Sequence, residues 1–178
     1  MTSNYYELPS RIASPLTSII DPDEKLLVPR DPKLADQLRG LGFETEAHEG
    51  TDHVFETSWW RERDQKFDWV VANTTGLREE QQYILDYGIA VAKHGLIILD
   101  RLSFLEPVRS RKKFLLNNKL SDLMILSPRP RFSSISSARD SVTSAWFVFR
   151  KPEDWLDGAN LRFALDWQTP PPLADESH

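Results

Sequence analysis

Residues 67–72 read FDWVVA and residues 95–99 read GLIIL. Both runs are short and apolar and contain β-branched side chains, which is typical of strands buried on both faces of a sheet. Between them, residues 77–94 carry apolar side chains on one helical face behind a charged first turn, so this segment is predicted to be a helix. A helix between two buried strands indicates a parallel crossover unit.

The same alternation continues on both sides of this unit. A helix is predicted from Pro32, with Asp31 as its N-cap, and a basic helix over 107–117. Further strands are predicted at 25–28, 43–47, 123–126 and 145–149. Strands that alternate with helices predict an α/β fold, a Rossmann-like three-layer sandwich with a mostly parallel sheet.

Such sheets bind ligands at the carboxyl ends of their strands, which here means the residues just after Val28, Ala72 and Leu99. The predicted α/β domain covers residues 25–150. Residues 1–24 contain three prolines and are predicted to be an irregular lead-in, and residues 151–178 a C-terminal extension with a proline-rich tail.

The composition is that of one globular domain, with 178 residues, 40% hydrophobic and 28% charged. The absence of cysteine excludes a disulfide framework, thiolate zinc sites and cysteine nucleophiles. The first residues lack the apolar stretch of a signal peptide, and no apolar run approaches the roughly 20 residues of a membrane span. We therefore expect a cytoplasmic protein without membrane contact.

Positive charge is concentrated in residues 101–131, which sum to +6, whereas the rest of the chain sums to −11. A local positive zone on an acidic protein favours a phosphate-facing surface, and the alternative is a solvated helix face followed by a basic loop. The candidate nucleic-acid-binding residues in this zone are Arg101, Arg109, Arg111, Lys112, Lys113, Arg129 and Arg131.

The strand over 67–72 is followed by Asn73, Thr74, Thr75 and Gly76. This arrangement resembles amino-methylating methyltransferases, in which the strand ends in Asn or Asp, two prolines and an aromatic residue. The resemblance implies that Asn73 and the carbonyl of Thr74 would orient a target amine. Gly76 stands where the aromatic residue would stack on a flipped base.

Three downstream motifs resemble phage and prophage adenine-methyltransferase-like proteins. They read GLIILDRLSFLE at 95–106, SPRPRF at 127–132 and DSVTSAWFVF at 140–149, and the likeness covers roughly residues 67–150. It implies a class I methyltransferase fold, S-adenosylmethionine (SAM) as cofactor and adenine in nucleic acid as substrate.

The front half departs from that family pattern. Such enzymes carry a glycine-rich turn after the first strand, because glycine lets the backbone approach the cofactor. Residues 28–32 read VPRDP and contain no glycine. By the same resemblance, Asp31, Glu49 and Asp52 are the candidate cofactor-binding residues, with Glu46 a further candidate for the ribose. His48 and His53 flank Gly50 in a strand and loop, so no metal site is expected.

Two interpretations follow. In the first, both altered loops mark a catalytically impaired pseudo-methyltransferase that serves as a binding or scaffolding module for nucleic acid or another protein, without a cofactor. In the second, the chain is an active, divergent SAM-dependent N-methyltransferase acting on an amine such as N6 of adenine in DNA or RNA. Asn73 and Thr74 are catalytic only in the second.

Overall fold

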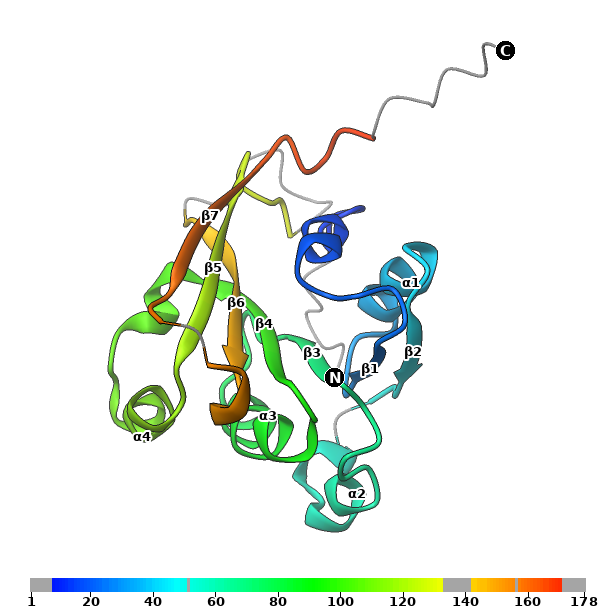
Figure 1. Cartoon of the computed structure of the whole chain (residues 1–178), viewed down its shortest axis with the longest axis vertical. Coiled ribbons are helices and arrows are strands. Elements are labelled where there is room, and N and C mark those ends of the chain that lie inside the picture. The colour runs from blue at the N-terminus through cyan, green and yellow to red at the C-terminus, as the bar shows by residue number, and fades with distance from the viewer. Residues whose placement is uncertain (1–7, 51, 133–141, 156, 171–178) are drawn as a thin grey trace, which may run out of the picture.

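Seven strands form one sheet at the centre of this computed structural model, in the order β2-β1-β3-β4-β6-β5-β7 (Figure 1). The structure describes residues 8–50, 52–132, 142–155 and 157–170. Antiparallel pairing joins β6 to β4 and β5, and the other neighbouring strands are parallel. The strands are Lys25–Val28 (β1), Glu44–Ala47 (β2), Trp69–Asn73 (β3), Gly95–Arg101 (β4), Leu120–Ser127 (β5), Ser144–Arg150 (β6) and Asn160–Leu165 (β7).

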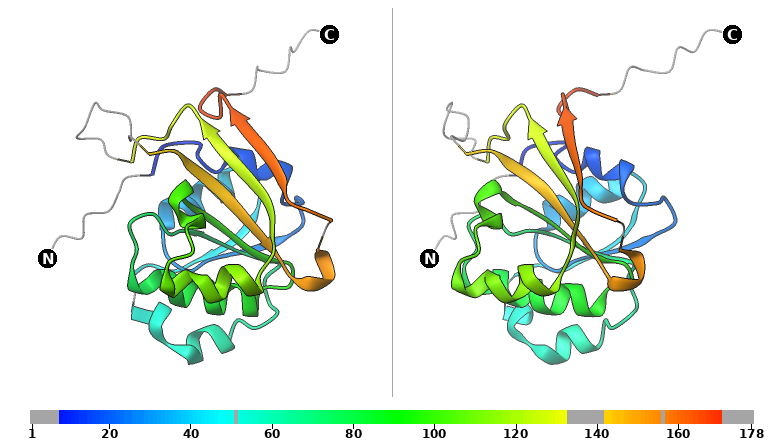
Figure 2. Two further views of the ribbon diagram at one scale, coloured as in Figure 1. Left: turned by 90° about the vertical axis from the view of Figure 1, so that its left-hand side faces the viewer. Right: turned by 60° about the vertical axis from the view of Figure 1, so that its left-hand side comes forward.

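Helices cover both faces of this sheet (Figure 2). The α-helices are Pro32–Gly40 (α1), Thr57–Arg61 (α2), Glu79–Val91 (α3) and Arg109–Asn117 (α4). Four short 3-10 helices are Ser14–Ser18 (η1), Asp52–Phe55 (η2), Leu102–Leu105 (η3) and Pro152–Asp154 (η4). The expected α/β sandwich with a mostly parallel sheet is confirmed.

Alternating side chains divide the core into two halves. Leu26 and Val28 of β1 pack with η1 and α1, whereas Leu27 between them packs with α2, α3 and α4. The side chains of β3, β4 and β6 also divide between the two clusters, and nearly every residue of these strands is buried. Burial on both faces explains why these strands read as continuous apolar runs in the sequence.

Segments on both sides of the central α/β unit complete this core. Ile12 and Leu16, in the predicted lead-in, are fully buried, and the carbonyl of Ile12 accepts a hydrogen bond from Trp146 Nε1 (2.9 Å). At the other end, β7 adds a parallel strand beside β5, and Trp167 just after it is buried. Periodicity alone does not identify η1, and β7 lies in a stretch whose pattern is mixed.

Among the helices that the structure describes, none has the length and apolar character needed to cross a membrane.

Gly95 provides a test of the packing between β4 and β6. A Cβ at this position would overlap the backbone carbonyl oxygen of Phe149. We expect Gly95→Ala to lower the free energy of unfolding by about 3 kcal/mol, the upper part of the range for overpacking. Gly40→Ala, where a Cβ would meet no atom within 4 Å, should change stability by less than about 1 kcal/mol. Urea denaturation measures both, and equal effects would contradict the packing described.

Candidate functional site

The carboxyl ends of β1, β3 and β4 meet at one edge of the sheet. The strand order reverses here, because the chain leaves β1 through α1 to reach β2 on one side, while β3 flanks β1 on the other. Such a switch point is where doubly wound sheets place their ligands. The structure brings Asp31, Asn73, Thr74 and Asp100 together at this edge.

Asp31 lies in the turn between β1 and α1 with a backbone conformation that favours glycine. Its φ is 114° and its ψ 79°, a strained geometry for a residue with a Cβ, at an expected cost of about 1–3 kcal/mol. Its Oδ1 accepts a hydrogen bond from the Leu34 N–H (3.1 Å), so Asp31 is the expected N-cap of α1. Burial raises the pKa of this carboxyl above its ordinary value.

Two side-chain contacts join the turn after β1 to the end of β3 and to the start of α3. Asn73 Nδ2 donates to Asp31 Oδ2 (3.4 Å), and Arg30 Nη1 lies 3.8 Å from Glu80 Oε1 in the first turn of α3. Asn73 Oδ1 accepts from the Thr75 N–H (3.1 Å). The polar groups at the switch point are therefore engaged with one another.

Thr74 points inward and is fully buried. Its hydroxyl donates to Asp100 Oδ2 (2.6 Å), and its carbonyl accepts from the Leu77 N–H (3.0 Å). Asp100 also accepts from Gln81 Nε2 (2.7 Å) and from the Arg101 N–H (2.7 Å). Burial raises the pKa of Asp100, although these donors favour the ionised form.

The part of the edge next to β2 holds an aromatic and charged cluster. His48 Nε2 lies 2.7 Å from Glu46 Oε1, and the guanidinium of Arg63 lies over the Trp59 ring and contacts Glu46 as well. His53 Nε2 lies 2.6 Å from the Pro29 carbonyl oxygen, which ties η2 to the end of β1. Glu46, a candidate for the ribose, is thus held by a histidine and an arginine.

The two remaining candidate cofactor residues are exposed, Glu49 after β2 and Asp52 at the start of η2. No hydrogen bond connects either of them to the cluster around Asp31 in the part of the chain that the structure describes. Within that part, no group of three or more His, Asp or Glu side chains is arranged to hold a metal ion.

The basic residues divide into two groups. Arg101 and Arg111 are half-buried, and the Arg111 guanidinium lies 5.2 Å from the centroid of the Phe104 ring. Charged groups exposed to solvent on α4 and after β5 are Arg109, Lys112, Lys113, Arg129 and Arg131.

The turn after β1 lacks the glycine-rich backbone that the resemblance to methyltransferases implies for SAM binding. A SAM carboxylate would need free backbone N–H groups and room beside the start of α1. The Asp31 carboxylate already accepts from that helix terminus, and its Cβ and negative charge stand where the family places glycine. The Asp31 side chain and a SAM carboxylate are therefore incompatible in both shape and charge at this position.

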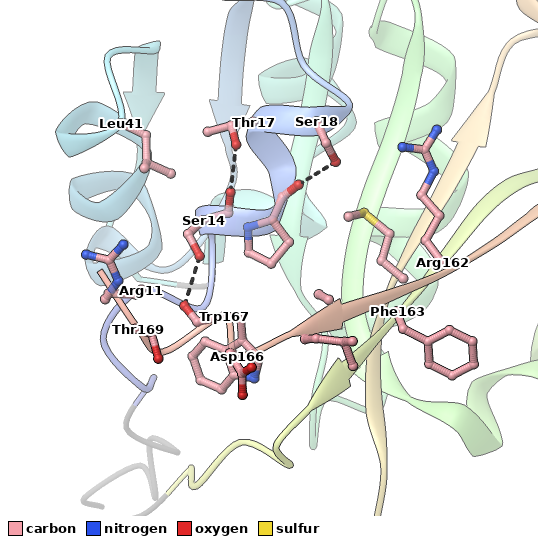
Figure 3. A pocket seen from close by; sticks show the side chains of 14 residues that line it. Arg11, Ser14, Thr17, Ser18, Leu41, Arg162, Phe163, Asp166, Trp167 and Thr169 are labelled. Atoms are coloured by element: carbon pink, nitrogen blue, oxygen red, sulfur yellow. Dashed lines mark hydrogen bonds between the residues drawn. The ribbon is translucent and has the colours of Figure 1, made fainter. Parts of the chain in front are cut away.

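A groove of about 660 Å³ lies elsewhere, between η1 and β7 (Figure 3). Ser14 and Thr17 of η1 line one side and Ala164 of β7 the other, with Met124 and Trp167 also in its wall. The Ser14 hydroxyl donates to the Trp167 carbonyl (3.1 Å). None of the site residues predicted from sequence lines this groove.

Sequence reasoning missed the partners that occupy the switch point. Asp100 directly follows the predicted strand over 95–99, so the rule that points to strand ends also points to it. Nothing local in the sequence indicates Gln81 or the Arg30–Glu80 contact, because both bridge segments that come together only in the folded chain.

No protein-family model and no curated protein matches the sequence. A solved structure from Listeria monocytogenes, named as a putative class I SAM-dependent methyltransferase, matches with a TM-score of 0.55 and 12% identity, covering 93% of this chain and 67% of that one. Another from Agrobacterium tumefaciens, named as a predicted O-methyltransferase, matches with a TM-score of 0.48 and 14% identity, covering 88% and 85%.

The fold is therefore that of the class I methyltransferases, with a matching strand order, and the expectation of this fold is confirmed. The resemblance to phage and prophage adenine methyltransferases stays a prediction. Two residues of its third motif, 140 and 141, lie outside the described residues.

The raised pKa of Asp100 has a consequence for stability. Above the ordinary carboxyl pKa of about 4, folded Asp100 holds its proton more readily than unfolded Asp100 does, so stability falls as pH rises through the interval between the two values. We expect the unfolding free energy of the wild type, relative to Asp100→Asn, to decrease from pH 4 upward. Chemical denaturation over a pH series measures it, and a flat difference would contradict the burial described.

Asp68 provides the matched control. Burial alone would raise the pKa of Asp68, but the Lys25 N–H and the Lys93 ammonium outweigh burial and lower it. The unfolding free energy of the wild type, relative to that of Asp68→Asn, should therefore rise with pH below about 4. This direction is opposite to the one expected for Asp100.

Proposed function

We propose that this chain is a methyltransferase-fold protein that does not methylate and acts as a binding module. The observation that carries this proposal is the Asp31 carboxylate, which caps α1 and contacts Asn73 at the switch point. In this fold the start of the first helix is the place for the carboxylate of an amino-acid-bearing cofactor. A second carboxylate there would have to displace the Leu34 contact and approach a negative charge.

The state of the predicted catalytic groups supports the same proposal. An exocyclic amine needs acceptors that face it, and Asn73 Oδ1 and the Thr74 carbonyl already accept from the N–H groups of Thr75 and Leu77. The Thr74 side chain is turned into the protein toward Asp100. Both acceptors thus form hydrogen bonds within the loop that leads into α3.

The second candidate function is an active, divergent SAM-dependent methyltransferase acting on an amine such as N6 of adenine. Asn73 favours it, because its side chain is only half-buried and an amide oxygen can accept a second hydrogen bond. This function requires the contact between Asp31 and Asn73 to open when cofactor binds.

Cofactor binding separates the two functions. Isothermal titration and thermal melting with SAM and S-adenosylhomocysteine should give no heat of binding and no shift for the wild type up to millimolar ligand, since Asp31 occupies the helix terminus. A shift that rises with ligand concentration would contradict the proposal. In that case Asn73→Ala should abolish methylation of adenine-containing DNA or RNA and leave cofactor affinity unchanged.

We further propose that the binding module takes nucleic acid through its basic surface, defined as Arg109, Lys112, Lys113, Arg129 and Arg131. Arg109 and Lys112 lie in the first turn of α4, which contains no acidic residue. Positive charge at a helix N-terminus is unfavourable for the helix, so helix stability does not explain it. The ends of β4 and β5 bring the start of α4 and Arg129 toward the same edge of the sheet.

Charge reversal tests this surface. The triple variant Arg109→Glu, Lys112→Glu and Lys113→Glu should lose retention of duplex DNA and single-stranded RNA in filter binding. The reason is that carboxylates would replace the positive charges that contact the phosphates. The log–log salt slope of wild-type binding to duplex DNA should be near −0.9 per phosphate contacted.

The control for that variant makes the same charge change elsewhere. Reversing Lys33, Arg61 and Lys66, which are exposed on other elements, should leave retention close to the wild-type value. Equal loss in both triple variants would indicate a general charge effect, and absence of wild-type retention would refute nucleic-acid binding.

A further inference from the structure

Strand β7 is an edge of the sheet. It is the last strand in the order and pairs with β5 alone among the strands that the structure describes. Alternate N–H and C=O groups along its outer side therefore face away from the sheet. An edge of this kind is a template for another strand unless charge, proline or a bulge protects it.

The side chains of β7 are unusually apolar for an exposed strand. Leu161, Phe163 and Leu165 are 60%, 59% and 67% exposed, and alternation places them on one face. The register with β5 pairs Leu161 with Leu123 and Phe163 with Ile125. Because those β5 residues pack beside the α3 and α4 cluster, the apolar face continues past the helices to the edge.

The opposite edge differs. Strand β2 is short and carries Glu44 and Glu46, with Glu44 paired to Lys25 (2.9 Å), so charge protects it from strand addition. Strand β7 contains neither a carboxylate nor a proline. Its one charge, Arg162, alternates to the other face and is neutralised by Asp122 (3.0 Å).

The sequence of β7 is complementary to itself. In an antiparallel pair of two copies centred on Phe163, each Leu161 faces Leu165 of the other copy and each Arg162 faces Ala164. Just beyond the strand, Asp166 faces Asn160. No like charges oppose one another, and three apolar side chains from each copy lie on one face.

We propose that two copies of this chain pair through β7, antiparallel about a twofold axis at Phe163, so that two seven-stranded sheets become one. A second copy fits better than an unrelated strand, because a symmetric interface requires the same segment to satisfy both sides, as this pattern does. The pairing would satisfy the outward backbone groups and pack Leu161, Phe163 and Leu165 of one copy beside the same residues of the other.

Sedimentation equilibrium of the full chain over the micromolar range tests the proposal. We expect the mass of a dimer for the wild type and half that mass for Phe163→Lys, because the axis places two ammonium groups against each other. Circular dichroism should confirm that Phe163→Lys is folded, since the side chain is mostly exposed. Phe55→Lys, the same exchange at an exposed phenylalanine in η2, should remain dimeric.

The register has a sharper test. Phe163→Glu should also be monomeric, and mixing it with Phe163→Lys should restore a dimer, because residue 163 faces itself across the axis. A monomeric wild type, a dimeric Phe163→Lys variant or a mixture that stays monomeric would each overturn the proposal. These readouts do not depend on SAM or nucleic acid.

Discussion

The central strands are buried on both faces, and this burial positions the other elements of the fold. β3, β4 and β6 have neighbours on both sides and layers above and below, so their backbone groups are satisfied within the sheet and their side chains fill both halves of the core. α1 and η1 must cover one face and α2, α3 and α4 the other. The carboxyl ends of β1, β3 and β4 are thereby fixed at one edge.

The polar groups at the switch point satisfy one another: Asp31 with the start of α1, Asn73 with Asp31 and Thr75, and Thr74 with Asp100. A polar group that already has hydrogen-bond partners contributes little to the free energy of binding a new ligand, because each new contact replaces an old one. The contacts of Asp31 with Leu34 and Asn73 hold its backbone in a strained conformation.

Two further surfaces lie on β7 and on α4. β7 extends the sheet beyond α4 and presents an apolar face with unpaired backbone groups, whereas the basic residues of α4 lie on a helix with no acidic residue in its first turn. Both surfaces lie outside the contacts that join Asp31, Asn73, Thr74 and Asp100.

The central architecture can be predicted from local sequence patterns. Apolar runs at 67–72 and 95–99, with the helix pattern between them, correctly predict β3, α3 and β4, and Asp31 followed by Pro32 correctly predicts the start of α1. These features are local, because burial and capping act on neighbouring residues and leave a periodic pattern.

The contacts made by the strand ends are visible only in the folded chain. Asn73 and Asp31 are 42 residues apart, and Thr74 and Asp100 are 26 apart, so no local pattern indicates that these side chains bind each other. The same holds for NLRFAL at 160–165: its apolar residues alternate as they do in a strand, but only the folded chain shows that this strand pairs with β5. The fold follows from local burial, whereas the state of the site follows from contacts between distant segments.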